Sequence, residues 1–253
     1  MGGVRFFSTT ALKRIVARLG ILVVLLLPSP HIIHGQQPPF VSSLLRQFES
    51  ENVFWRQFEV AKAIVAASDT SVLPQLESWL THQDRHLRGN AAFIFAGLGD
   101  PRGFDAIVAM IDDRSERREV HNISSAGLPS IQEQIREDRY YAAHLLGDLK
   151  DPRAIPILVP LLTDPDVNYI VPWSLGQIGN PSAITALIGS LSDLDPSMRV
   201  LAIHALIELK ATGAVPRLRQ LLDDTARSTF DKFESVAEAA QDAIDKLQSE
   251  GAR

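Results

Sequence analysis

Two of the seven histidines stand at a spacing that could do chemistry. His82 and His86 are four residues apart, and on a helix this spacing lets two imidazoles share one metal ion. The pair lies in the segment THQDRH, which is typical of a link between helices, and no HExxH glutamate accompanies it. We therefore interpret both histidines as solvated link residues and predict no metal site.

Other reactive groups argue against catalysis. The chain contains no cysteine, which excludes disulfides, thiolate metal sites and a cysteine nucleophile. Serine, histidine and aspartate are all present, but no Gly-x-Ser-x-Gly elbow orders them into a triad. Glycine-rich dinucleotide and phosphate loops are absent too. We therefore assign no catalytic residue and no cofactor.

Aromatic and imidazole side chains recur at one position of the helical pattern in four successive segments: Phe93, His144, Trp173 and His204. Two tyrosines of neighbouring segments, Tyr140 and Tyr169, are likewise equivalent, and Tyr141 follows the first. Rings with a polar tip are favoured at protein interfaces, where one side is dry and the other wet. The alternative is that these rings fill gaps between packed helices, especially around Pro172, which should disturb its helix.

A repeated pair of helices would position these side chains. Four segments superpose without gaps: AGLGDPRGFDAIVAMIDD (96–113), GDLKDPRAIPILVPLLTD (147–164), GQIGNPSAITALIGSLSD (176–193) and IELKATGAVPRLRQLLDD (207–224). An earlier segment, VAASDTSVLPQLESWLTH (65–82), also fits, and most steps between copies are 29 to 31 residues. A fixed period near 30 residues predicts a solenoid, in which each hairpin stacks on the next to bury its apolar face.

The turns of the repeat carry helix-start signals. Asp100, Asp151 and Asn180 are predicted N-caps, each followed by a proline at the first helical position. Pro156 and Pro216 stand one turn further in, so their helices should bend or begin late. The last copy has Ala-Thr-Gly at 211–213 in place of the capped turn.

The pattern R-x-x-A-A-x-x-L-G-x-x-x-D-P-R-A-I-P-x-L, as residues 139–158 present it, resembles the HEAT-like repeat of the phycobilisome-lyase type. The resemblance covers about residues 50–249, with five copies and a final helix. It implies an all-α, right-handed α-solenoid of the armadillo type with capping helices. Its members include scaffolds, bilin lyases and one kind of iron hydroxylase. That hydroxylase holds two irons through His-Glu pairs, and this chain has no adjacent His-Glu.

One step breaks the period, because 51 residues separate Phe104 from Ile155. The extra residues correspond to an insertion at about 114–137, and solenoid insertions often lie on the binding face. A tolerated, partly helical excursion is the alternative interpretation. The insertion and the aromatic and imidazole side chains of the adjoining repeats together supply our candidate partner-binding residues: Arg117, Arg118, His121, Tyr140, Tyr141, His144, Tyr169 and Trp173.

The first 35 residues resemble a secretory signal. Four basic residues and no acidic one precede the apolar run LGILVVLLLP (19–28), which is shorter than the roughly 20 residues that span a membrane. We expect cleavage near Gly35, with an uncleaved anchor or a transit peptide as alternatives. Cleavage would take the net charge from −5 to −9, and so acidic a chain is a poor candidate for nucleic-acid binding.

These observations predict a signal peptide (1–35), a linker and capping helix (36–50) and a HEAT-like repeat domain (51–249). We expect an exported, periplasmic or extracellular scaffold that binds another protein. It would contact a membrane only if the leader is retained. The alternatives are a metal-dependent oxidoreductase or bilin-lyase-like enzyme of the related branches, and a structural module of an envelope assembly. Lyase substrates of the related branch are cytoplasmic, so an export signal argues against that activity.

Overall fold

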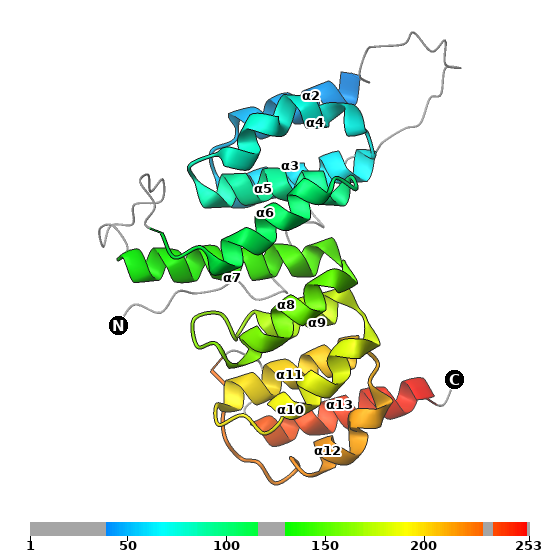
Figure 1. Cartoon of the computed structure of the whole chain (residues 1–253). Coiled ribbons are helices and arrows are strands. Elements are labelled where there is room, and N and C mark those ends of the chain that lie inside the picture. The colour runs from blue at the N-terminus through cyan, green and yellow to red at the C-terminus, as the bar shows by residue number, and fades with distance from the viewer. Residues whose placement is uncertain (1–38, 116–129, 230–234, 252–253) are drawn as a thin grey trace. The chain divides into compact units, whose positions relative to one another are not determined.

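The computed structural model describes residues 39–115, 130–229 and 235–251, which belong to one compact unit of the chain and contain helices and turns but no strand (Figure 1). The helices are α2 (Pro39–Ser50), α3 (Phe54–Ala67), α4 (Leu73–Leu76), α5 (Arg85–Gly97), α6 (Pro101–Asp112), α7 (Ile131–Leu149), α8 (Ile155–Leu158), α9 (Val171–Ile178), α10 (Ile184–Ser190), α11 (Pro196–Glu208), α12 (Val215–Arg219) and α13 (Val236–Gly251). Short 3-10 turns accompany them: η1 (Thr70–Val72), η2 (Glu77–Thr81), η3 (Pro152–Ala154), η4 (Val159–Thr163), η5 (Pro181–Ala183) and η6 (Thr212–Ala214). The predicted signal peptide lies outside the described residues.

Five hairpins follow one another along the described chain. Their first helices are α3, α5, α7, α9 and α11, and each packs against the first helix of the next hairpin. The second members are α4, α6, α8, α10 and α12 with their 3-10 turns. Helix α2 packs against α3 at one end, and α13 packs against α11 and α12 at the other (Figure 1). The prediction of an all-α solenoid is confirmed.

The turns between helices are capped as predicted. The side chains of Asp100, Asp151 and Asn180 each accept a hydrogen bond from the backbone N–H two residues further on. Asp69 does the same in the first hairpin. Ala211 has no side-chain cap, and its turn is closed by backbone hydrogen bonds alone.

The second helices are shorter and more broken than the apolar spacing suggests. Pro156 and Pro216 stand in the first turns of α8 and α12, which begin late, behind a 3-10 turn. Helix α10 also begins behind a 3-10 turn although Thr185 stands at the matching position, so proline alone does not set the late start. Helix α6 has no such proline and runs unbroken from Pro101. It also passes very close to α5, since a Cβ on Gly103 would lie 2.2 Å from the Ala92 carbonyl oxygen. Only glycine fits at that contact.

Pro172 does not interrupt a helix as we expected. Helix α9 begins at Val171, so Pro172 stands in its first turn, where a proline removes no needed hydrogen bond. The preceding residues 165–170 form turns instead of extending the helix. The first helix of this hairpin is therefore only 8 residues long.

A recurrent ion pair joins the first helices α7 and α11 to the links that follow their hairpins. Arg139 of α7 contacts Asp164, and its Nε donates to the Ile111 carbonyl oxygen of the preceding hairpin at 2.8 Å. At the same position of α11, Arg199 pairs with Asp224 at 2.9 Å. The fourth copy has Asn168 there. These clasps hold neighbouring hairpins in register through buried, charge-assisted hydrogen bonds.

The core is continuous across the hairpins and rests on small side chains. The alanine pairs of α5 and α7, Ala91-Ala92 and Ala142-Ala143, are fully buried, which allows close approach of neighbouring helices. No helix among the described residues is long and apolar enough to cross a membrane.

Candidate functional site

The junction between α5 and α7 contains a chain of buried polar side chains. The hydroxyl of Tyr141 donates to the Asn90 side-chain oxygen. Asn90 donates to the Gln57 side-chain oxygen at 2.9 Å, and Gln57 donates to the Phe48 carbonyl oxygen at 3.0 Å. Burial raises the pKa of Tyr141 well above its ordinary value, so the hydroxyl stays protonated and able to donate. This series of hydrogen bonds links α7, α5, α3 and α2.

A buried ion cluster lies in the same junction. Asp138 of α7 has no exposed surface and accepts a hydrogen bond from Arg85 Nη1 at 2.8 Å. Arg85 also pairs with Asp113 at 3.0 Å, and its Nη2 donates to the Ser115 carbonyl oxygen at 2.8 Å. His86 Nε2 lies 3.7 Å from the other oxygen of Asp138. A buried carboxylate is tolerated because a buried arginine neutralises it.

Sequence reasoning missed this cluster, although one signal was available. Leu87, Val167 and Met198 occupy the equivalent position in the second, fourth and fifth copies, and all three are buried. The first copy has Arg56 there, which is exposed. A carboxylate where three other copies bury an apolar side chain indicates a buried partner of opposite charge.

Aromatic rings cover the polar junction. Phe54 stacks on His86 with centroids 4.4 Å apart and meets Tyr141 edge to face at 5.2 Å. Phe58 packs against Phe93 at 4.9 Å. These rings are wholly or largely buried. They close off the hydrogen-bond chain and form part of the packed core.

The aromatic row reaches the surface between α7 and α9. His144 and Trp173 are each half-buried, and their ring centroids are 4.5 Å apart. Asp148, one turn beyond His144, lies 3.1 Å from its Nδ1. The Trp173 ring also lies over Gly147, where an added Cβ would meet Trp173 at 3.0 Å and the Ser174 Cα at 2.7 Å. We call His144, Asp148 and Trp173 the aromatic face.

The other predicted contact residues divide by position. Tyr140 is half-buried, and burial raises its pKa to about 12. Tyr169 donates its hydroxyl to Asp195, which raises its pKa to about 12 as well. Tyr141 is only 9% exposed, and its hydroxyl is committed to Asn90. This corrects the expectation for Tyr141, because a core side chain is not available to a partner. Arg117, Arg118 and His121 lie outside the described residues.

Of the two histidines four residues apart, His86 does not lie where we expected. His82 lies in the link, where its ring stacks on Trp79 and its Nδ1 accepts from the Asp84 backbone N–H. His86 is 6% exposed, in the first turn of α5, and is not a solvated link residue. Among the residues that the structure describes, no group of three His, Asp or Glu side chains could hold a metal ion.

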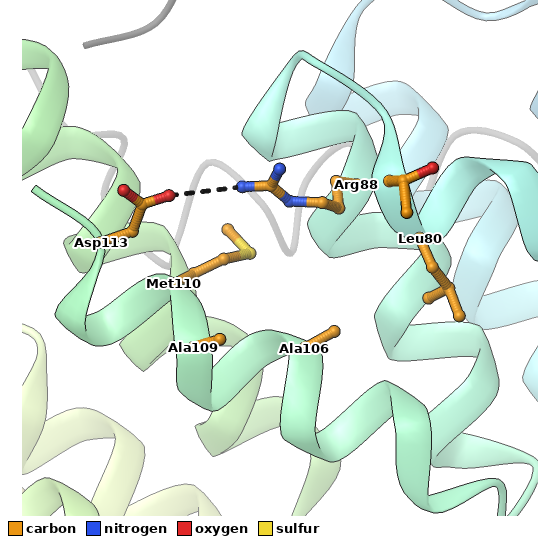
Figure 2. A pocket seen from close by; sticks show the side chains of 7 residues that line it. Leu80, Arg88, Ala106, Ala109, Met110 and Asp113 are labelled. Atoms are coloured by element: carbon orange, nitrogen blue, oxygen red, sulfur yellow. Dashed lines mark ion pairs between the residues drawn. The ribbon is translucent and has the colours of Figure 1, made fainter. Parts of the chain in front are cut away.

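A pocket of about 360 Å³ lies between η2, α5 and α6 (Figure 2). Its lining is mostly apolar, with one ion pair at its edge: Leu80, Thr81, Arg88, Ala106, Ala109, Met110 and Asp113. Arg88 lies 3.7 Å from Asp113, as the dashed line in Figure 2 shows, and burial lowers the pKa of Arg88 from its ordinary value. The Thr81 hydroxyl bonds to the Ser78 carbonyl oxygen at 3.1 Å. This lining suits an apolar group, and its one carboxylate, Asp113, is paired with Arg85 and Arg88.

Comparisons with known proteins find a repeat family in the second half of the chain. Residues 131–193 and 167–230 match a family model described as HEAT repeats. The chain is therefore a HEAT-like repeat protein. A solved structure of an engineered protein is 19% identical, covering 84% of this chain and 98% of its own, with a TM-score of 0.44.

Three curated relatives carry enzyme or biosynthesis names. The phycocyanobilin lyase subunit alpha of Synechococcus elongatus is 41% identical over 34% of this chain and 36% of its own. The bilin biosynthesis protein PecE of Nostoc is 31% identical over 56% and 53%. The deoxyhypusine hydroxylase of Rattus norvegicus is 29% identical over 61% and 54%. The chain thus spans about half or less of the length of these relatives.

Proposed function

We propose that this protein is a non-catalytic scaffold that binds another protein. The observation that carries the proposal is the aromatic face, where the paired rings of His144 and Trp173 reach the surface on a rigid row of helices. Solenoids supply extended surfaces for partners. Half-buried Trp is enriched among the residues that dominate interface energies. Tyr140 and Tyr169 of the same two hairpins extend the contact set.

Matched tryptophan variants test the proposal. Trp173→Ala removes one ring of the aromatic face, whereas Trp55→Ala removes a tryptophan of α3 that is 55% exposed and does not belong to that face as defined. We expect the wild-type protein and the Trp55 variant to capture the same partner from an extract of the native cells. The Trp173 variant should lose it while keeping its helical circular dichroism. Equal capture by all three would refute the aromatic face, and no specific capture by wild type would refute the scaffold.

An enzymatic function is the second candidate, because two relatives carry the names of a bilin lyase subunit and a bilin biosynthesis protein. In support of the scaffold, Tyr141 is bonded to Asn90 and Asp138 to Arg85 inside the covered α5–α7 junction. The one carboxylate that lines the pocket, Asp113, is paired with arginine. Metal analysis and an absorption spectrum of the purified protein distinguish the two. Stoichiometric metal or a visible chromophore would favour the enzyme.

We further propose that the scaffold acts after export, as the basic leader and the apolar run at 19–28 suggest. N-terminal sequencing of the protein from its native cells tests this. A mature chain that begins near Gln36 is expected, and a chain that retains Met1 in the cytosol would contradict export.

A further inference from the structure

The second helices of the third and fourth hairpins differ in charge from those of the other hairpins. No charged residue occurs from Ala154 to Thr163 or from Ala183 to Ser192. The corresponding stretches of the other hairpins carry charges: Glu77, Asp105, Asp112, Arg217, Arg219 and Asp223. Long charged side chains normally cover helical surfaces and keep them soluble. Their absence from two adjacent hairpins singles out one part of the surface.

This uncharged surface is accessible. Its residues are Pro156, Ile157, Pro160, Thr185, Ile188 and Gly189, which we call the neutral face. Four of them are exposed and the two isoleucines are half-buried. Pro156 matches Thr185 and Pro160 matches Gly189, so the two hairpins present equivalent positions side by side. A Cβ built on Gly189 meets nothing within 4 Å.

The composition of the neutral face suits a dry contact. Proline and glycine have no side-chain rotamers to lose when a partner covers them. Charged residues are depleted at the buried centres of protein interfaces, as they are here. The prolines also lack a backbone N–H, so a partner buries no unsatisfied donor at these positions. Covering this face therefore costs little conformational entropy and little polar desolvation.

The two margins of the neutral face differ in electrostatic balance. On the α6 side, Arg153 pairs with Asp151 at 2.6 Å and lies over the Phe104 ring. On the α12 side, Arg217 Nη2 donates to the Ser192 hydroxyl at 2.6 Å, which places its guanidinium at the end of α10. Within the described part of the chain, neither Arg217 nor Arg219 pairs with a carboxylate. The α12 margin thus carries positive charge that a partner could neutralise.

We propose that the neutral face docks an apolar segment of another protein whose aspartate or glutamate residues pair with Arg217 and Arg219. This inference builds on the proposed scaffold function, since it gives the chain a second surface on its second helices, apart from the aromatic face on α7 and α9. One chain then holds two partners, or two segments of one partner.

Selection from a displayed library of random 16-residue peptides against the wild-type protein tests the partner chemistry. We expect the enriched peptides to be apolar, with aspartate or glutamate clustered towards one end. Their binding, measured by fluorescence anisotropy, should weaken at least about tenfold in Arg217→Ala and should fall with added salt. Enriched peptides that are basic, or an empty selection, would overturn the inference.

A charge placed within the neutral face tests the location. Gly189→Glu puts a carboxylate where the structure has open space, so the fold has room for it. It should weaken peptide binding at least tenfold. Ser78→Glu is the matched control, because Ser78 is exposed at the equivalent position of the first hairpin. Binding that survives Gly189→Glu overturns the inference, as does self-association of wild type that this variant abolishes. Capture that depends on Trp173 is measured separately, so the two proposals fail independently.

Discussion

The α5–α7 junction and the α9–α11 junction occupy corresponding places in the repeat but differ in chemistry. In the first, Asn90 meets Tyr141 and Arg85 meets Asp138, all largely or wholly buried. In the second, α9 meets α11 through apolar side chains such as Leu175 and Leu206, with Gly176 beside Ala205. The first junction lies where the 30-residue period is broken, and the second lies where the period holds.

The difference shows what each junction requires. An apolar contact tolerates small shifts, because hydrophobic contact is not directional. A buried ion pair requires its partner at one place, because an uncompensated buried charge is strongly unfavourable. We infer that the polar network sets the register of α7 on α5 where the regular period no longer does. Four predictions follow from this comparison, from the largest expected effect to the smallest.

The first prediction concerns the buried carboxylate. Asp138→Ala leaves Arg85, which is 3% exposed, without its buried partner, and should lower the free energy of unfolding by about 3–5 kcal/mol. Urea unfolding followed by circular dichroism measures this. Asp242→Ala is the control, since it breaks a surface pair with Lys246 in α13 and should cost below about 0.5 kcal/mol. Similar losses in both variants would contradict a special role for the polar junction.

The second prediction concerns the apolar junction. Leu175 has no exposed surface, so Leu175→Ala should cost about 3 kcal/mol through lost burial and the cavity left behind. Leu175→Met conserves volume and should cost less than about 1.5 kcal/mol. The isosteric Asp138→Asn should cost more than that, because it removes the charge that Arg85 needs. If both conservative changes cost the same in urea unfolding, the two junctions do not differ as described.

The third prediction isolates one hydrogen bond. Tyr141→Phe removes the hydroxyl and leaves the buried Asn90 oxygen unsatisfied, at an expected cost of about 2 kcal/mol. Tyr169→Phe is the matched control, because its acceptor Asp195 is half-buried and water can replace the hydroxyl. It should cost less than about 1 kcal/mol. If thermal unfolding shows a larger loss of stability in Tyr169→Phe than in Tyr141→Phe, the hydrogen bond in the link is the more important of the two.

The smallest effect should appear with pH. The hydrogen bond from Arg139 lowers the pKa of Asp164 from its ordinary value. A lowered carboxyl pKa contributes stability that is present above about pH 5 and is lost as the pH falls through the lowered pKa. Asp164→Asn should therefore be less stable than wild type by roughly 1 kcal/mol at pH 7. The stability difference should vanish towards pH 2. Urea unfolding at pH 7 and pH 2 measures it, and an equal difference at both pH values would disprove the linkage.

Much of the fold could be predicted because its signals are local or periodic. At four sites, an Asp or Asn followed by Pro begins a helix or a 3-10 turn, since the side chain caps the N–H two residues on: Asp100, Asp151, Asn180 and Asp195. Pro156 and Pro216 stand in the first turns of their helices, where proline is tolerated. The prediction that Pro172 disturbs its helix was wrong, because proline suits a first helical turn as well as a kink. Only packing decides which of the two forms.

The candidate site could be predicted only in part. His144 and Trp173 were found because they share a column of the repeat, and the structure brings their rings together. Tyr141 belongs to the same pattern, yet packing buries it against Asn90. Sequence spacing gives the side of a helix on which a residue lies. It does not give the depth at which the neighbouring helix covers it.

The sequence alone determined a stacked array of helical hairpins and the turns that cap them. These features depend on residues a few positions apart, or on a period that repeats. The tertiary structure alone decided that Asp138 meets Arg85 and that Tyr141 meets Asn90, across 53 and 51 residues. Such pairs carry no local signal, because their members lie far apart in the sequence and meet only when α7 packs on α5.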